Sequence, residues 1–406
     1  MPAYYSSSRS VKKRKQQQTT RKRLLSMATA CLGALMVWTG LDVLQLLMRP
    51  VLPPFISFEP TVPTMQTAAL TPPETDSQPI NVADLITISE NILTVFTGST
   101  PDTHLVTTDH NVFDISQLEP QDTDWADRTP EPFALQFNHD TLDELRNVDI
   151  LINRFFTVNN NTGISAVQDY FDIDYFLSSD LHIEPHASQP QVLIFHTHGM
   201  SEFFVDSPGR YHPDYKYHGI MGVGVTLAHL LEEVYGIGVI HHKGLYDWVD
   251  GQVQRSGSYE RSGPSVERIL AENPSIQLVI DLHRDGIDNG LRETFVTYIN
   301  GRPYARLMFV NGLSSLHLGG VTNRLYHIPN PYIQTNLALS FNLQMAMNER
   351  FPGLSRRTFL AAFRFINHLR PLSLLVEVGM QANTMADAHN AMEPLAYLIY
   401  SVVFTQ

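Results

Sequence analysis

Thiols are almost absent from this 406-residue sequence. Cys31 is its single cysteine, so no disulfide within the chain and no thiolate-rich metal site can form. Any metal that the protein binds must therefore be held by histidine, aspartate or glutamate.

Positive charge is scarce outside the first 23 residues. Those residues hold eight of the 28 lysines and arginines and no acidic residue. The remainder keeps 20 basic and 41 acidic residues, a net charge of −21. This charge argues against nucleic acid as the partner of the folded part, because nucleic-acid-binding domains carry basic surfaces.

Charge of either sign is absent from Leu24 to Leu41. With its extension to residue 48, the apolar segment reaches the roughly 20 residues that a helix needs to cross a bilayer. We therefore expect residues 24–48 to be a single-pass anchor in the cell membrane. The positive-inside rule places residues 1–23 in the cytoplasm and the rest outside. The alternative is a cleaved signal peptide, but the small residues of its motif, Ala28 to Ala30, lie too early in the apolar segment.

Residues 49–137 show few signs of a packed core. As far as Asn81 they are rich in proline, threonine and serine, a composition that predicts an extended tether. From there to residue 137 no hydrophobic period is sustained, so we expect a poorly ordered stalk. Periodic patterns return at His139, and we place a folded domain at residues 138–406.

Strand and helix patterns alternate from Leu151 onward. This alternation favours an α/β fold with a mainly parallel sheet and helices on both faces. Strands are expected at residues 192–195, 238–241, 278–282, 293–299, 306–311 and 374–378. Helices are expected at residues 223–235, 265–271, 336–350 and 384–404. Asn300-Gly301 predicts a hairpin between residues 297–299 and 306–309, which makes one edge of the sheet antiparallel.

Three of the expected strands end in side chains that can do chemistry. The segment QVLIFHTHGMSE ends with His196, His198 and Glu202, QLVIDLHRD ends with His283, Arg284 and Asp285, and SLLVEVG presents Glu377. Because ligands bind outside the carboxyl ends of parallel strands, we expect these side chains to converge. Two imidazoles and a carboxylate are a known ligand set of catalytic Zn²⁺. A further carboxylate, Glu377, suits a general base that moves a proton from water to the leaving group.

Several blocks of the sequence carry a family resemblance. They are VLIFHTHGMSE, NPSIQLVIDLHRDGID, RLMFVNGLS, NPYIQTNLALSFNLQ, FPGLSRR and LRPLSLLVEVGMQANTMADAHNAMEPLA. In their order and spacing, over residues 140–403, they resemble the catalytic domain of stage II sporulation protein P, a membrane-anchored cell-wall hydrolase of endospore-forming bacteria. More distantly they are similar to the zinc-dependent N-acetylmuramoyl-L-alanine amidases, whose two histidines and glutamate match His198, His283 and Glu377.

The resemblance implies an activity, a cofactor and partners. The activity is hydrolysis of the amide between the muramoyl lactyl group and the first L-alanine of the peptidoglycan stem peptide during sporulation, with cleavage of peptide cross-links in some members. The cofactor is zinc, held by His198, Glu202 and His283. The implied partners are a lytic transglycosylase and other membrane proteins of the septum. In the family the glutamate follows the second histidine by three residues, whereas Glu202 follows His198 by four, so His218 is the alternative third ligand.

Other roles remain open from the residues alone. His196 shares a strand face with His198 if the strand continues, so it would bind the metal itself, support a ligand or contact substrate. Arg284 would either pair with Asp285 or bind a carboxylate of the peptide. Glu377 is a fourth ligand or a partner of Arg284 if it is not the base.

Two functions of other kinds are weighed beside the zinc amidase. A serine hydrolase would use Ser201, although no Gly-x-Ser-x-Gly motif surrounds it. A non-enzymatic wall-binding scaffold with a decayed site is favoured only by the offset of Glu202.

Overall fold

The computed structural model describes residues 132–405 except 134, 136, 288 and 289. All of these fall within one compact unit, residues 78–406. The predicted basic tail, membrane anchor and tether lie outside the described residues, as does the predicted stalk as far as residue 131. At the end of that stalk, Phe133, Leu135 and Phe137 pack against the core of the domain. Within the described part, no helix combines the length and the apolar character that a membrane crossing requires.

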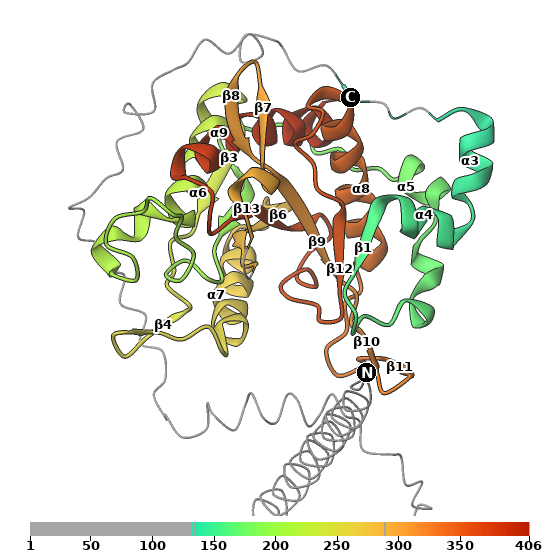
Figure 1. Ribbon diagram of the computed structural model, residues 1–406, viewed down its shortest axis with the longest axis horizontal. Helices are drawn as coiled ribbons and strands as arrows, with labels where there is room; N and C mark the ends of the chain where they lie inside the picture. Colours follow the sequence, from blue (N-terminus) through green and yellow to red (C-terminus); the bar gives the residue numbers. More distant parts are fainter. Residues whose placement is uncertain (1–131, 134, 136, 288–289, 406) are drawn as a thin grey trace, which may run out of the picture. The chain divides into compact units, whose positions relative to one another are not determined.

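A seven-stranded sheet forms the centre of the domain (Figure 1). Its strands are β1 (Phe156–Val158), β2 (Pro190–Phe195), β3 (Gly238–His241), β6 (Leu278–Asp285), β9 (Leu307–Gly312), β12 (Thr358–Ala361) and β13 (Ser373–Met380). They lie in the order β1-β12-β9-β13-β6-β2-β3. Every pair of neighbours is parallel except β13 and β9. The predicted α/β fold with a mainly parallel sheet is confirmed.

The antiparallel neighbours lie in the middle of the sheet, which corrects the prediction of an antiparallel edge. The predicted hairpin forms, but it joins β7 (Val296–Ile299) to β8 (Arg302–Ala305) in a separate two-stranded sheet. Asn300 and Gly301 both have positive φ, 51° and 81°, as a tight hairpin turn requires. The residues expected to complete the hairpin instead open β9 in the main sheet.

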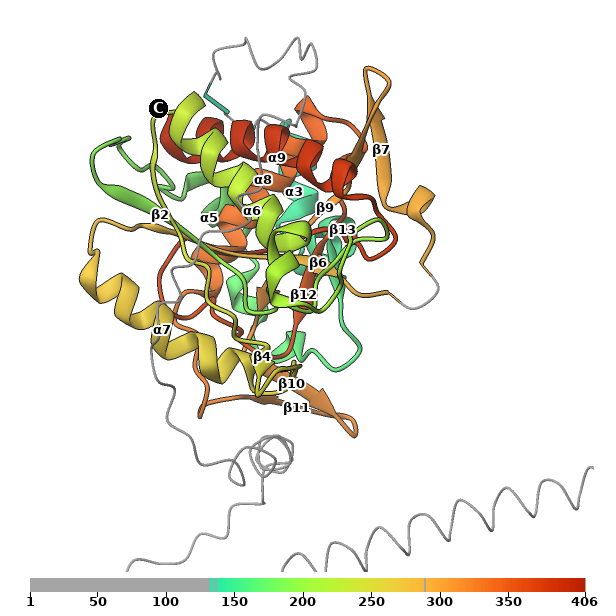
Figure 2. The same cartoon turned by 90° about the vertical axis from the view of Figure 1, so that its left-hand side faces the viewer.

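Helices cover both faces of the sheet (Figure 2). On one face lie α6 (Ile220–His229), continued by the π-helix η5 (Leu230–Val234), α8 (Ile333–Arg350) and α9 (Met385–Ile399), continued by the π-helix η7 (Tyr400–Phe404); on the other lies α7 (Ser258–Glu272). The remaining elements are α3 (His139–Leu145), α4 (Val148–Phe155), α5 (Ile173–Ser178), the short helices η2 (Ile164–Ala166), η3 (Gln168–Tyr170), η4 (Pro213–His218) and η6 (Arg292–Thr294), and the small hairpins β4 (Trp248–Val249) with β5 (Gln252–Val253) and β10 (Ser315–Leu318) with β11 (Val321–Arg324).

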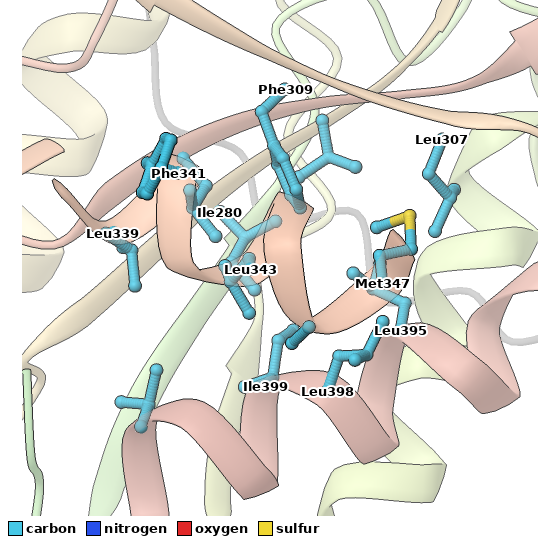
Figure 3. Packing of buried hydrophobic residues seen from close by; sticks show 14 of the residues in the cluster. Ile280, Leu307, Phe309, Leu339, Phe341, Leu343, Met347, Leu395, Leu398 and Ile399 are labelled. Atoms are coloured by element: carbon cyan, nitrogen blue, oxygen red, sulfur yellow. The ribbon is translucent and has the colours of Figure 1, made fainter. Parts of the chain in front are cut away.

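Alternation along the strands divides the core into two layers. In β2, Val192 and Ile194 belong to the large core beneath α6, α8 and α9, whereas Leu193 and Phe195 pack with α7. Figure 3 shows strand residues such as Ile280 meeting side chains of α8 and α9. Leu278, Ile280 and Leu282 of β6 and Leu374, Val376 and Val378 of β13 belong to this large core. Since side chains alternate, their odd-numbered residues face the side of α7, namely Val279, Asp281, His283 and Asp285 of β6 and Leu375 and Glu377 of β13.

Candidate active site

His283 and Glu377 are neighbours across two adjacent strands. They are register partners between β6 and β13, and Glu377 also lies opposite Met308 of β9. Residues paired across strands project from the same face. The predicted site therefore lies on the α7 side of the sheet, towards the carboxyl ends of β6 and β13, rather than wholly beyond the strand ends.

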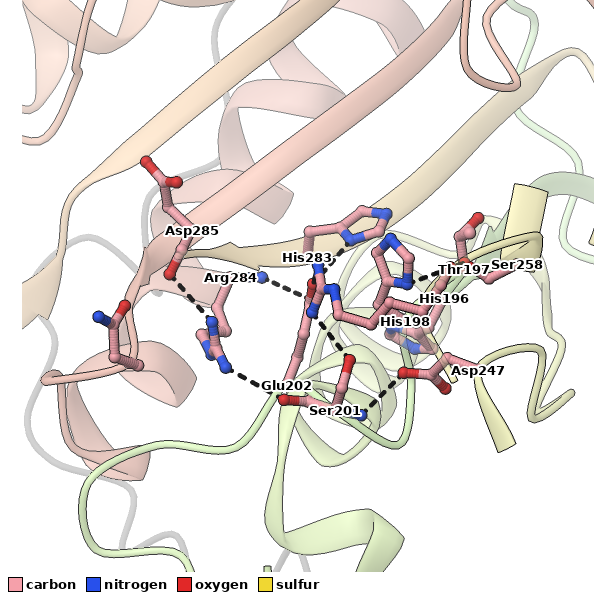
Figure 4. Close-up of polar contacts among 12 residues, drawn as sticks. His196, Thr197, His198, Ser201, Glu202, Asp247, Ser258, His283, Arg284 and Asp285 are labelled. Atoms are coloured by element: carbon pink, nitrogen blue, oxygen red, sulfur yellow. Dashed lines mark hydrogen bonds and ion pairs between the residues drawn. The ribbon is translucent and has the colours of Figure 1, made fainter. Parts of the chain in front are cut away.

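His198 reaches the same place from the loop after β2. Its ring centroid lies 5.4 Å from that of His283, with the ring planes at 72°. Its Nδ1 lies 3.1 Å from Oγ of Ser258, at the start of α7, and its ring meets Tyr259 edge-on. Figure 4 shows His198, His283 and Glu202 grouped together. The first turn of α7 therefore orients His198 towards the sheet.

His198, His283 and Glu377 line one cavity of about 690 Å³. Apolar side chains form part of its wall, namely Met308, Val310, Phe359 and Leu375. Polar side chains also line it, among them Arg255, Tyr259, Asp285, Arg306, Arg356 and Arg357. A cavity with apolar walls and a few convergent polar groups is typical of a binding site for small molecules. The structure thus brings both predicted histidines and the predicted base to one cavity.

Glu202 lies behind His283, with its side chain 1% exposed. Its Oε1 is 3.1 Å from Nδ1 of His283 and 3.2 Å from Nη2 of Arg255, and its Oε2 accepts from the backbone N–H of Arg284 at 2.9 Å. Burial raises the pKa of this carboxyl, but the nearby cations, His283 above all, outweigh burial and hold the pKa well below its usual range. The extra residue in the loop after His198 has not moved Glu202 away from His283.

The ring of His283 lies between two carboxylates. Nδ1 faces Glu202, and Nε2 lies 2.7 Å from Oδ1 of Asp281 without hydrogen-bond geometry. Burial opposes a charge on the ring, but Asp281 and Glu202 raise the pKa of His283 well above its ordinary value. A carboxylate on the far nitrogen is the usual support of a metal-ligating histidine. Asp281 also accepts from the N–H and the hydroxyl of Thr197, which fixes the loop that carries His198.

The imidazole and carboxylate groups of His198, His283 and Glu202 are of the types that bind zinc. The distance between the donor atoms of Glu202 and His283 also fits a zinc site. Oε1 of Glu202 and Nδ1 of His283 are 3.1 Å apart, close to the roughly 3.3 Å between two ligand atoms that each lie about 2.0–2.1 Å from a tetrahedral zinc. No group of three histidine, cysteine, aspartate or glutamate side chains in the described part of the chain is arranged as a complete metal site. The zinc centre therefore stays a prediction.

His196 lies away from the cavity. Its side chain is fully buried, with Nδ1 2.8 Å from the carbonyl of Leu282 and Nε2 2.9 Å from Nε2 of His241. Burial lowers the pKa of His196 to about 4. An enclosed ring cannot touch a substrate in the cavity, and this placement corrects the prediction of substrate contact. His196 instead joins the end of β2 to β6 and β3.

Arg284 points away from the cavity as well. Its guanidinium donates to the backbone carbonyls of Phe203, Ser201 and Asp285 at 3.0–3.1 Å. The carboxylate of Asp285 pairs with Arg356 at 2.7 Å. The pairing of Asp285 with Arg356 corrects the predicted ion pair between Arg284 and Asp285. Binding of a peptide carboxylate by Arg284 stays a prediction. Arg284 stabilises the loop that presents Glu202.

His218, the alternative ligand, ends η4 and packs beside Tyr215, with ring centroids 5.8 Å apart. Neither His218 nor Glu202 is among the residues that line the cavity. Of the two, Glu202 is the one that contacts His283, and this contact favours it as the third ligand.

Sequence reasoning missed residues that support the site from a distance. Asp247 is fully buried and accepts from the N–H groups of Met200 and Ser201 at 2.9 and 2.8 Å. Asp281 and Ser258 contact the two histidines directly. Only Asp281 carried a signal in the sequence, because it precedes His283 by two residues on the same strand face.

The domain matches a known protein family. The model of the family Stage II sporulation protein P (SpoIIP) matches residues 136–400. The chain belongs to the SpoIIP family. It is 28% identical over 218 residues to stage II sporulation protein P of Bacillus subtilis (strain 168), an alignment that covers 50% of this chain and 49% of that protein. The chain thus spans about half the length of this curated SpoIIP relative, and the predicted family resemblance is confirmed.

Two solved structures show a more distant likeness to this SpoIIP family member. One is the CwlD amidase of Clostridioides difficile in complex with the GerS lipoprotein, with a TM-score of 0.33, 14% identity, and coverage of 52% of this chain and 94% of that chain. The other is the apo form of Ami1, an N-acetylmuramyl-L-alanine amidase of Mycobacterium abscessus, with a TM-score of 0.29, 10% identity, and coverage of 52% and 98%.

Proposed function

We propose that this protein is a peptidoglycan hydrolase of sporulation that cleaves the amide between the muramoyl lactyl group and the first L-alanine of the stem peptide. Membership of the SpoIIP family supports the proposal. The observation that carries it is the cavity shared by His198, His283 and Glu377, with Glu202 in contact with His283. In this proposal His198, Glu202 and His283 hold zinc.

Each proposed ligand has a neighbour that fixes it. Ser258 contacts His198, Asp281 contacts His283, and the backbone of Arg284 donates to Glu202. Burial lowers the pKa of His198 to about 3, which keeps its ring neutral, the form that binds metals. Zinc, when bound, supplies a coordinated water of lowered pKa and polarises the scissile carbonyl.

Glu377 is the residue that we propose moves the proton. Its Oε2 is buried and has no hydrogen-bond partner among the residues described. Burial above all raises the pKa of Glu377 to about 8, and a divalent cation nearby lowers the pKa again. The ionised carboxylate then takes a proton from the attacking water and donates it to the leaving amine.

The cut bond identifies the activity directly. We expect the full chain, incubated with zinc and purified peptidoglycan, to release stem peptides that begin with a free L-alanine amine and to leave lactyl carboxylates on intact glycan strands. Mass spectrometry of the fragments measures this. A His198→Ala protein is the matched control and is expected to release none. Release of peptides cut only within cross-links would contradict the amidase assignment, and no release at all would contradict the hydrolase.

The two other kinds of function find no support in the geometry. Ser201 is buried, and its Oγ accepts from Nη1 of Arg255 at 2.8 Å rather than contacting a histidine. The scaffold was favoured by the offset of Glu202, yet Glu202 lies 3.1 Å from His283. We therefore propose a peptidoglycan hydrolase rather than a serine hydrolase or a wall-binding scaffold.

We also propose that residues 24–48 anchor the protein in the cell membrane, with the tether and the catalytic domain outside. The family resemblance adds peptidoglycan as substrate and a lytic transglycosylase and other septal membrane proteins as partners.

Protease treatment tests the topology. Protease added to intact protoplasts is expected to remove residues 138–406, because the positive-inside rule leaves them outside the membrane. An antibody against the domain follows its loss, and a cytoplasmic protein serves as the control for intact membranes. A domain that survives in intact protoplasts but is digested after lysis would show the opposite orientation.

A further inference from the structure

Two arginines occupy one end of the cavity. Arg306 directly precedes β9, and Arg356 follows the loop after α8; both line the cavity that His283 and Glu377 share. The two segments are joined by the backbone N–H of Arg356, which donates to the carbonyl of Leu307 at 2.7 Å. The pKa of Arg306 is lowered by burial and by the like charge of Arg356. The two guanidinium groups are therefore near enough to repel each other.

Positive charge exceeds negative charge at this end. Arg356 pairs with Asp285 at 2.7 Å. Arg306 has no such partner among the described side chains, and its Nη1 and Nη2 donate to the uncharged backbone carbonyls of Thr294 and Ser355. Burial of a charge without a counter-charge is unfavourable. An anion that entered here would balance it.

Two buried guanidinium N–H groups at this end of the cavity lack acceptors. Nε of Arg306 and Nη1 of Arg356 are buried and have no hydrogen-bond partner in the described structure. Glu377 does not fill that place, since its own Oε2 is also without a partner. A planar carboxylate matches the fork of a guanidinium group and forms charge-assisted hydrogen bonds with it.

We infer that Arg306 and Arg356 form a subsite for a carboxylate carried by the peptide arm of the substrate. This inference rests on the proposed function, which supplies an acidic peptide to the cavity. Asp285, the partner of Arg356, follows His283 by two residues on the same face of β6, a displacement of roughly 7 Å along a strand. An extended peptide advances about 3.3–3.6 Å per residue. The carboxylate thus belongs about two residues from the scissile bond.

Binding to the unaltered protein tests the subsite without any need for cleavage. The ligands are a stem peptide with free carboxylates and the same peptide with those groups converted to carboxamides. The full chain in detergent micelles is expected to bind the acidic peptide roughly 10- to 100-fold more tightly, because hydrogen bonds between charged groups are stronger than neutral ones. Titration calorimetry at two salt concentrations measures the ratio. Equal affinities for the two peptides would overturn the inference.

Cleavage of the matching muropeptides separates this inference from the proposed function. If the acidic peptide binds more tightly but neither muropeptide is hydrolysed, the carboxylate subsite is supported and the proposed hydrolase activity is contradicted. If both muropeptides are cleaved and both peptides bind with equal affinity, the proposed hydrolase activity is supported and the carboxylate subsite is contradicted.

Substitutions of the two arginines test whether they cause the tighter binding of the acidic peptide. Arg306→Gln and Arg356→Gln are each expected to reduce the acid-to-amide affinity ratio towards one while affinity for the amide peptide changes little. Arg306→Lys keeps the charge and is expected to restore part of the ratio. Arg324→Gln, whose side chain contacts Tyr170 instead of the cavity, is the control. A merely structural role would weaken binding of both peptides alike, and an unchanged ratio in both cavity variants would remove the assignment.

Discussion

Replacing Glu377 with glutamine is expected to slow peptidoglycan hydrolysis by roughly 10²- to 10⁴-fold, the usual effect of losing a general acid or base. Glutamine keeps the shape of the side chain and its hydrogen bonding but cannot accept the proton. Zinc content and muropeptide affinity are therefore expected to match those of the parent. Turnover of a defined muropeptide, metal analysis and a binding titration measure the three quantities.

Met308→Leu is the matched control for Glu377→Gln. Met308 lies opposite Glu377 across the sheet and lines the same cavity, and a swap between methionine and leucine nearly conserves volume. It is expected to change turnover only a few-fold. A Glu377→Gln protein with near-parental turnover would rule out the proposed base. Loss of zinc from this variant would instead identify Glu377 as a ligand.

Replacing His283 with alanine is expected to lower the zinc content from about one per chain to near zero and to abolish hydrolysis, because a catalytic zinc has about three protein ligands. The variant also leaves Asp281 and Glu202 without the imidazole between them, so circular dichroism must confirm that it is folded. His389→Ala removes another buried histidine, which lies in α9 and contacts Thr226 of α6, and this variant is expected to keep its zinc. Full zinc occupancy in folded His283→Ala protein would refute the metal site.

The third ligand is decided by the same metal analysis. Glu202→Ala is expected to lose zinc, and His218→Ala is expected to retain it, because only Glu202 contacts His283. The reverse result would move the ligand to His218.

Much of the central sheet could be predicted because its strands are short apolar runs with polar ends. The predicted limits of β2, β6 and β13 differ from the observed ones by no more than three residues. α7 was harder, because the predicted helix begins at residue 265 whereas the observed helix begins at Ser258 and contains Pro264. The first turn of α7, absent from the prediction, holds the Ser258 that contacts His198.

Within the site, the period of the strands explains both the successes and the failures. His283 and Glu377 follow strict alternation, so their common face was implied once their strands were neighbours. The same rule failed for His196 and His198 because β2 ends at Phe195, and side chains in the turn that follows no longer alternate. Contacts such as those of Asp247 with Met200 depend on segments brought together by the tertiary fold, which local sequence patterns do not encode.

The middle strand of the sheet, β13, is also the last of its strands in the chain. During synthesis, β6 and β9 therefore lack their shared neighbour until Ser373–Met380 has been made. Leu278 and Ser373 are 95 residues apart, which corresponds to about 5–20 s of translation. For most of that time only β6-β2-β3 can be assembled, because β12, which joins β1 to β9, is made only at Thr358–Ala361. The unpaired inner edge of β6 can meanwhile pair with another chain. Folding of this domain is thus completed only when its C-terminal segment closes the gap.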